Sequence, residues 1–174
     1  MKKYLIADTH FYHDKIKEYC NRPDNYNEMI INNWNSTIKD EDLIIHLGDV
    51  AFGIKKRFGD IVRSLKGTKI LVKGNHDRES YAYYMRNGFS FVCDTFTYKG
   101  ILFSHFPMKI ELPIVHNIHG HFHNAKYEKW EGYYKNILTP QHKIFIIEEI
   151  GYRPISIDKM FKYLITTIDI IKRK

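Results

Sequence analysis

The stretch Lys69-Ile70-Leu71-Val72-Lys73-Gly74-Asn75-His76-Asp77 joins a short apolar run to a polar turn. The run is β-branched and apolar and is entered through Gly67, which predicts a short buried strand that ends at Gly74. Three side chains with functional groups then follow the carboxyl end of that strand, where α/β sheets place their ligands. Asn and Asp are also ordinary turn residues, so the stretch gains weight from other strands that end in the same way.

The residues before Gly88 alternate between predicted strands and predicted helices. We expect strands at 2–8, 43–47 and 69–73, and helices at 14–20, 28–38, 54–65 and 79–87. Asn27 is the expected cap of the second helix. This β-α alternation predicts a parallel, layered sheet and an α/β fold.

The second half of the chain is richer in short strands, so the fold class is α/β with an α+β character. Further strands are expected at 89–92, 95–98, 101–104, 114–119 and 144–149. They suggest a second sheet packed on the first. Ser156 is the expected cap of a C-terminal helix, because apolar residues from Ile157 to Ile171 repeat with a period near 3.6.

Length and composition limit the class of protein. The 174 residues, with 44% hydrophobic and 27% charged residues, predict a single globular domain over 1–174. No apolar run approaches the roughly 20 residues of a membrane span, so we expect a cytoplasmic protein without a membrane partner. Cys20 and Cys93 are far apart and predict reduced thiols rather than a disulfide.

The chain carries a formal net charge of +7. This charge is compatible with a nucleic acid or another phosphorylated partner. It is equally compatible with a composition rich in Ile, Lys, Asn and Tyr, and no run of like charges reaches five residues. Charge alone therefore leaves the partner open.

Polar residues that can bind metal follow several of the predicted strands. They are Asp8, His10, Asp49, Asn75, His76, His105, His121 and His123. Oxygen and imidazole ligands without thiols suit Mn, Fe, Zn or Ni. The spacing in Asp8-x-His10 and His121-x-His123 places each pair on one face of an extended segment. Even seven of these eight residues, without His76, exceed the needs of one ion, and they suffice for two divalent ions if Asp49 bridges them.

The pattern D-x-H, G-D, G-N-H-[DE], H, G-H-x-H across residues 8–123 resembles the calcineurin-like metallophosphoesterase family, in particular its small phosphodiesterase-like members. The resemblance implies a four-layer α-β-β-α sandwich with two metal ions. By the resemblance, the first ion takes Asp8, His10 and His123, and the second takes Asn75, His105 and His121. Asp49 bridges the two ions. A metal-bound hydroxide then attacks phosphorus, and His76 protonates the leaving oxygen or stabilises the phosphoryl charge.

One departure from the family pattern concerns the residues after Asp49. Related phosphatases carry G-D-x-x-D-R-G, whereas this chain has Phe52 in place of the second Asp and Gly53 in place of the Arg. The resemblance therefore favours a phosphodiester substrate, such as a cyclic or short nucleotide or a nucleic-acid diester. The Asp that usually orients the catalytic His is missing, so Asp77 or the backbone remains to orient His76.

Other residues near the motifs are candidates for substrate contacts. We consider His13, Arg78 and Arg22 in this role, the arginines because a guanidinium matches phosphate geometry. His46 lies inside an apolar strand and is interpreted as a hydrogen-bonded core residue. Two alternative functions stay open: a phosphomonoesterase, and a non-catalytic scaffold of this fold that binds a protein partner.

Overall fold

The strands of the computed structural model, which describes residues 1–53, 57–123 and 132–160, form two sheets. The first has the order β4-β3-β2-β1-β9 and comprises β1 (Lys3–Ile6), β2 (Leu43–His46), β3 (Thr68–Val72), β4 (Phe91–Cys93) and β9 (Ile155–Ser156). The second comprises β5 (Thr95–Tyr98), β6 (Ile101–Ser104), β7 (His116–His119) and β8 (His142–Ile144), in chain order. All pairings are parallel except β1 with β9 and β5 with β6.

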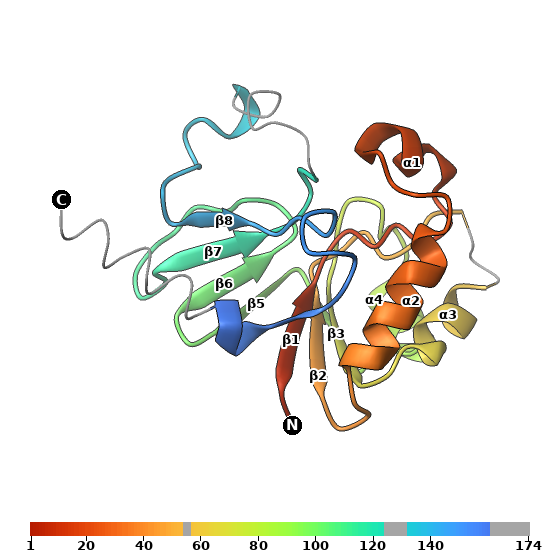
Figure 1. Ribbon diagram of the computed structural model, residues 1–174. Helices are drawn as coiled ribbons and strands as arrows, with labels where there is room; N and C mark the ends of the chain where they lie inside the picture. Colours follow the sequence, from red (N-terminus) through yellow and green to blue (C-terminus); the bar gives the residue numbers. More distant parts are fainter. Residues whose placement is uncertain (54–56, 124–131, 161–174) are drawn as a thin grey trace.

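Four helices lie on the side of the first sheet that faces away from the second (Figure 1). They are α1 (Asp14–Cys20), α2 (Tyr26–Thr37), α3 (Phe58–Ser64) and α4 (Tyr81–Arg86). The predicted α/β class, with two sheets and flanking helices, is confirmed. The expected C-terminal helix begins at 157–160, and the rest of it lies outside the described residues. Within the described part of the chain, no helix is both long and apolar enough to cross a bilayer.

One apolar core connects the two sheets with the helices. Leu5, Ile45 and Leu71 of the first sheet, Trp34 of α2 and Phe103 of β6 all belong to it, and each is at most 1% exposed. Burying such side chains is the main favourable term in folding. The shared core therefore fixes the position of one sheet relative to the other, and with it the strand ends that carry the polar motifs.

Several predicted boundaries are wrong. Helix α2 begins at Tyr26 rather than at 28, and Asn27 caps nothing: its Oδ1 accepts the N–H of Tyr12 at 3.0 Å. The strand expected at 144–149 is β8, which ends at Ile144, and a turn follows at 147–150. Ser156 stands directly before the C-terminal helix, as expected, but it is also paired with Tyr4 in β9, a strand that was not predicted. A strand of two residues carries no periodicity that a sequence could reveal.

The five polar motifs all follow the carboxyl ends of strands. Asp8, Asp49, Asn75, His105 and His121 come one to three residues after the ends of β1, β2, β3, β6 and β7, respectively. The arrowheads of β1, β6 and β7 point to one region of the molecule (Figure 1). The two sheets thus bring motifs far apart in the sequence to a common edge.

Candidate metal centre

The predicted ligands gather in two clusters. Asp8, His10 and His123 form the first, and Asp49, His105 and His121 form the second. Within each cluster the candidate ligand atoms lie within 4.8 Å of one another. Asn75 joins the second cluster, because its Oδ1 lies 2.9 Å from Nε2 of His105. All seven residues predicted as ligands therefore meet at the common edge of the sheets.

The Asp49 carboxylate lies between the two clusters. Its Oδ2 is 3.5 Å from Nε2 of His10 in the first cluster and 3.4 Å from Nε2 of His105 in the second. One oxygen atom is thus within reach of both ligand sets. This is the position that a carboxylate shared by two ions would occupy.

Left-handed backbone is concentrated at these ligands. Positive φ angles of 46° to 73° occur at Asp8, His10, Asp49, His121 and His123. For residues other than glycine such a conformation costs on the order of 1–3 kcal/mol, and it persists where the surrounding structure imposes it. The prediction that the D-x-H and H-x-H pairs lie on extended segments is wrong. Each pair converges because the chain turns at both of its members.

Buried hydrogen bonds hold the ligand loops together. The backbone N–H groups of Asp8 and His10 donate to the carbonyls of Gly48 and Asp49, each at 3.0 Å. The buried carboxylate of Asp77 accepts the N–H groups of Asp49 at 2.7 Å and Gly74 at 2.8 Å. Asp77 therefore connects the loop after β2 to the loop after β3 through hydrogen bonds.

His46 is the buried, hydrogen-bonded residue that the sequence predicts. Its Nδ1 accepts the N–H of Gly48 at 3.1 Å, and its Nε2 lies 3.0 Å from Oγ1 of Thr9. The Thr9 hydroxyl donates to the carbonyl of Val50 at 2.8 Å. Burial lowers the pKa of His46 to about 3, so the ring is neutral and links the loops after β1 and β2.

The close approach of the loops after β2 and β3 predicts a clash for Gly74→Ala. A Cβ at Gly74 would meet Oδ1 of Asp49, and it would lie 2.6 Å from the backbone nitrogen of Asp49. We expect a loss of about 1–3 kcal/mol in unfolding free energy, measured by urea denaturation of metal-free protein. The control is Gly132→Ala, where a Cβ meets nothing within 4 Å. Equal stability of the two variants would contradict the close packing of these two loops.

The imidazoles of the second cluster are neutral, as metal ligands must be. Burial lowers the pKa of His105 to about 4 and that of His121 to about 3. Nδ1 of His105 lies 2.8 Å from the carbonyl of Leu47, which keeps the proton there and leaves the Nε2 lone pair for a ligand. Nε2 of His105 and Nδ1 of His121 are 3.2 Å apart. Two nitrogens bound to one ion at about 2.1 Å have a similar separation.

The buried carboxylates of the centre are only partly compensated by positive charge. Burial lowers the pKa of His123, but the nearby Asp8 carboxylate outweighs this and raises it to about 10. Asp8 and Asp49 are 1% and 2% exposed, and burial raises the pKa of both carboxyls above its ordinary range. Both ring nitrogens of His10 are buried without a hydrogen-bond partner in the described structure. Burying a charge or a polar nitrogen costs free energy unless the group is paired, hydrogen-bonded or bound to a metal ion. The residues present therefore fit divalent cations in both clusters.

His76 stands beside the clusters rather than in them. Its Nε2 is 4.0 Å from Oδ2 of Asp49, and its backbone N–H donates to Oδ1 of Asp49 at 2.9 Å. The ring packs edge-on against Phe52 with 5.5 Å between centroids, and its side chain is 28% exposed. The backbone bond to Asp49 and the contact with Phe52 thus position this histidine. The carboxylate of Asp77 points to backbone N–H groups instead.

Arg22 differs from its predicted role as a substrate contact. Its side chain is fully buried, and NH1 and NH2 donate to the carbonyls of Thr9 and Asp8 at 2.9 and 2.8 Å. Nε donates to Oε1 of Glu148 at 2.9 Å. The guanidinium therefore stabilises the turned backbone of the D-x-H loop and is not presented to a substrate.

Glu148 is a site residue that the sequence reasoning missed. Its Oε1 lies 3.5 Å from Nδ1 of His123, on the side of the ring away from Asp8, whose Oδ1 is 3.9 Å from Nε2. A carboxylate in this position orients a ligating imidazole. A signal was available, because Glu148 follows the apolar run 144–147 as the other polar motifs follow their strands.

The remaining predicted contacts surround His76. His13 stacks on Phe52 with 4.3 Å between ring centroids and lies 5.4 Å from the ring of His10. Arg78 is exposed and lines a cleft together with His76. Both residues are therefore placed where a substrate bound at the clusters could reach them.

Comparison with known proteins agrees with this centre. The sequence model of the calcineurin-like phosphoesterase family matches residues 1–159. That match spans most of the chain and contains all seven ligands of the two clusters. The chain therefore belongs to the calcineurin-like phosphoesterase family.

Two relatives are similar to this chain over nearly their whole length. The chain is 29% identical over 180 residues to the uncharacterized protein MJ1445 of Methanocaldococcus jannaschii, covering 94% of this chain and 91% of that protein. The crystal structure of AQ665 from Aquifex aeolicus, a protein of unknown function, superimposes with a TM-score of 0.70 at 29% identity. That match covers 93% of this chain and 98% of AQ665. A more distant match is Pseudomonas putida nuclease MPE, at 19% identity and a TM-score of 0.48, covering 70% and 60% of the two chains.

Proposed function

We propose that the protein is a dinuclear metal-dependent phosphodiesterase that hydrolyses a nucleotide-type diester. The observation that carries the proposal is the position of the Asp49 carboxylate. One of its oxygen atoms lies within reach of both ligand clusters. One ion would take Asp8, His10 and His123, the other Asn75, His105 and His121, with Asp49 shared. When bound, two such ions supply Lewis acidity and an activated nucleophile for attack on a phosphate ester.

His76 is the proposed general acid or charge stabiliser. It lies 4.0 Å from the shared Asp49 oxygen and is partly open to solvent, so a substrate phosphate at the clusters would be within its reach. An imidazole in this position donates a proton to the leaving oxygen or a hydrogen bond to the phosphoryl oxygens. Phe52 contacts the His76 ring in an edge-on arrangement, and Nδ1 of His76 has no hydrogen-bond partner among the described residues.

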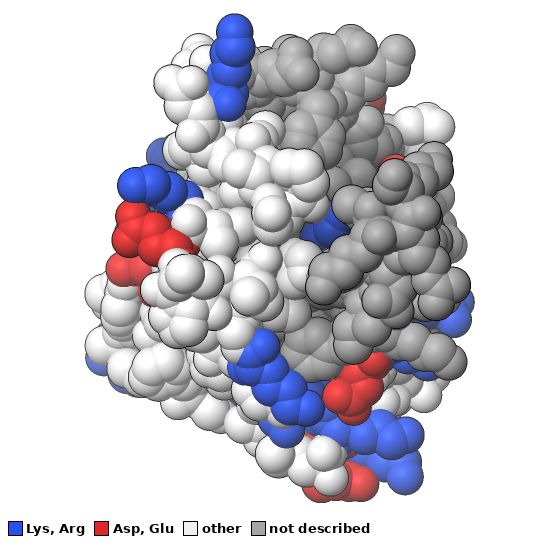
Figure 2. Space-filling view, turned by 90° about the vertical axis from the view of Figure 1, so that its left-hand side faces the viewer, with Lys and Arg blue, Asp and Glu red and all other residues white. Residues whose placement is uncertain are grey.

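The residues after Asp49 support a diester rather than a monoester. Phe52 and Gly53 stand where monoester-cleaving relatives are expected to carry Asp and Arg, so the terminal dianion of a monoester loses a cationic contact. The net charge of +7 favours an anionic substrate. Figure 2 shows charged groups of both signs scattered around the face on the side of the second sheet, without a continuous basic surface on its described part.

The test compares a diester with a monoester. Metal-free protein is incubated with Mn²⁺ or Ni²⁺, and release of p-nitrophenolate from bis(p-nitrophenyl) phosphate is compared with release from p-nitrophenyl phosphate. We expect the diester to be cleaved about tenfold faster or more, because a missing charge-assisted contact is worth about 1.5–3 kcal/mol. A chelator added to the same reaction should abolish turnover.

The two alternatives predict different results in this assay. A phosphomonoesterase would cleave p-nitrophenyl phosphate faster than the diester. A non-catalytic scaffold would bind the ions and cleave neither substrate. His76 and all seven candidate ligands are present, which weighs against the scaffold.

A further inference from the structure

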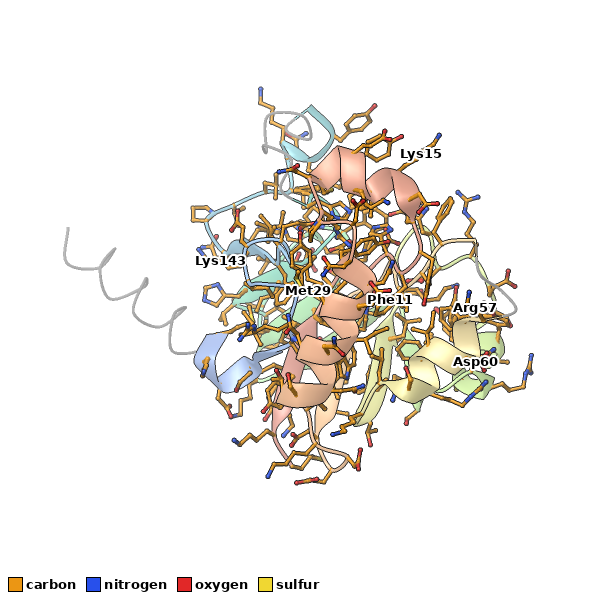
Figure 3. The ribbon with its side chains drawn as sticks, turned by 45° about the vertical axis from the view of Figure 1, so that its right-hand side comes forward. Phe11, Lys15, Met29, Arg57, Asp60 and Lys143 are labelled. Carbon is orange, nitrogen blue, oxygen red and sulfur yellow. The ribbon has the colours of Figure 1, made fainter. Side chains whose placement is uncertain are left out.

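A cleft of about 790 Å³ opens beside His76 on the side of α3 and α4. Its wall contains His76, Phe52 and Gly53 from the loops of the metal centre, and the remaining lining residues are Ala51, Arg57, Phe58, Arg78, Glu79, Tyr83 and Tyr84. Figure 3 shows Arg57 with Asp60 at α3, on the opposite side of the molecule from Lys143 of β8. The cleft is therefore continuous with the centre through His76, and it is not part of either ligand cluster.

Aromatic rings form much of this cleft. Phe58 packs against Tyr83 and Tyr84 with centroid distances of 5.7 and 5.5 Å, and Phe58 and Tyr84 are buried. Phe52 is different, because 43% of its surface is exposed although it lies between two histidine rings. A large apolar ring exposed beside a polar centre offers a flat surface on which another ring can stack.

Positive charge accompanies the rings. Arg57 and Arg78 are exposed at the cleft, and neither pairs with a carboxylate of the described residues. The guanidinium of Arg57 lies 5.4 Å from the ring centroid of Tyr12. Aromatic surface and two guanidinium groups together match a nucleoside phosphate.

We propose that this cleft binds the leaving-group nucleoside of the substrate, with its base stacked on Phe52 and the scissile phosphate next to it contacted by Arg78. The inference rests on the proposed function, because His76 faces the leaving group only if the clusters hold the scissile phosphate. The same loop residue then has two tasks: Phe52 contacts the His76 ring and receives the base on the part of its surface that His13 and His76 leave exposed. The substrate class is a diester whose leaving group is a nucleoside, not an aliphatic alcohol.

The test measures binding without metal, so that it is independent of turnover. Metal-free protein is titrated with adenosine 5′-monophosphate and with ribose 5-phosphate, followed by saturation-transfer difference NMR. We expect the base protons to receive the largest saturation, and ribose 5-phosphate to bind at least about tenfold more weakly, since base stacking contributes this much. Phe52→Ala should weaken binding of the nucleotide about tenfold and leave binding of ribose 5-phosphate unchanged.

A matched control uses another exposed phenylalanine. Phe91 of β4 is 52% exposed and lies outside the cleft lining, so Phe91→Ala should bind the nucleotide as the parent protein does. Equal binding of the two ligands, or an equal effect of both substitutions, would overturn the cleft assignment. Metal-dependent turnover of the diester without base-selective binding would overturn this inference alone. Base-selective binding without any turnover would overturn the proposed hydrolysis and keep the nucleoside site.

Discussion

Asp49→Asn is expected to remove both metal ions from the protein together. The Asp49 oxygen that lies 3.5 Å from His10 and 3.4 Å from His105 carries the charge that both ions would share, and a neutral amide supplies no bridging anion. We expect the affinity for each ion to fall by more than about 100-fold. Removing a residue that only hydrogen-bonds to a metal ligand costs about 10- to 100-fold in affinity, and removing a shared ligand should cost more. Metal content after desalting, measured by plasma mass spectrometry, should drop from two ions per chain to nearly none.

The same substitution should leave the metal-free fold intact. Burial raises the pKa of the Asp49 carboxyl, so its charge is unfavourable without metal, and an amide removes that cost. Asn tolerates the left-handed backbone at this position and can still accept the His76 N–H. We therefore expect the metal-free variant to unfold at the same urea concentration as the parent or higher. Asp60→Asn, at an exposed helical Asp, is the control that should keep both ions. Loss of a single ion would refute the bridging role.

His76→Ala is expected to lower turnover by about 10²–10⁴-fold while the protein still binds two ions. This range is the usual contribution of one positioned acid or base. His76 belongs to neither cluster, and its side chain is partly exposed, so its removal should disturb neither the ions nor the core. Steady-state kinetics and metal content are measured on the same preparation. If the variant loses metal in proportion to activity, His76 is a ligand and the assignment is wrong.

The choice of leaving group separates the two proposed roles of His76. Nitrophenolate leaves without a proton, whereas the sugar alkoxide of a dinucleotide needs one. A general acid predicts a large loss for the dinucleotide and a small loss for bis(p-nitrophenyl) phosphate. A charge stabiliser predicts similar losses for both substrates, because the phosphoryl oxygens are the same in each.

The meeting of the ligands was predictable from the sequence because it follows from topology. Residues such as Asp8, Asp49 and Asn75 come two or three residues after parallel strands, and the carboxyl ends of parallel strands share one edge. The sequence also predicts His46 as a core residue from its apolar neighbours. In these cases the residue pattern of each strand and its neighbours was sufficient for the prediction, and no contact between distant parts of the chain had to be known.

The rest depends on contacts between distant parts of the chain. The role of Arg22 is set by Glu148, which is 126 positions away, and nothing near Arg22 in the sequence indicates this partner. The left-handed turns at Asp8 and His10 are imposed by bonds to the loop after β2, against the local preference of these residues. The packing of Phe52 on His76 likewise appears only when the two loops lie side by side.

The left-handed backbone at the candidate ligands bears on when the protein could acquire a metal in the cell. A growing polypeptide samples such conformations rarely, so the short D-x-H and H-x-H segments are poor chelators while they leave the ribosome. His123 is synthesised long after Asp8, and the site exists only once both sheets have docked. The finished pocket, not the nascent chain, is therefore the form that would take up the ion. Because sites of this kind discriminate weakly among divalent metals, the ion pool that surrounds the newly folded protein decides which metal it carries.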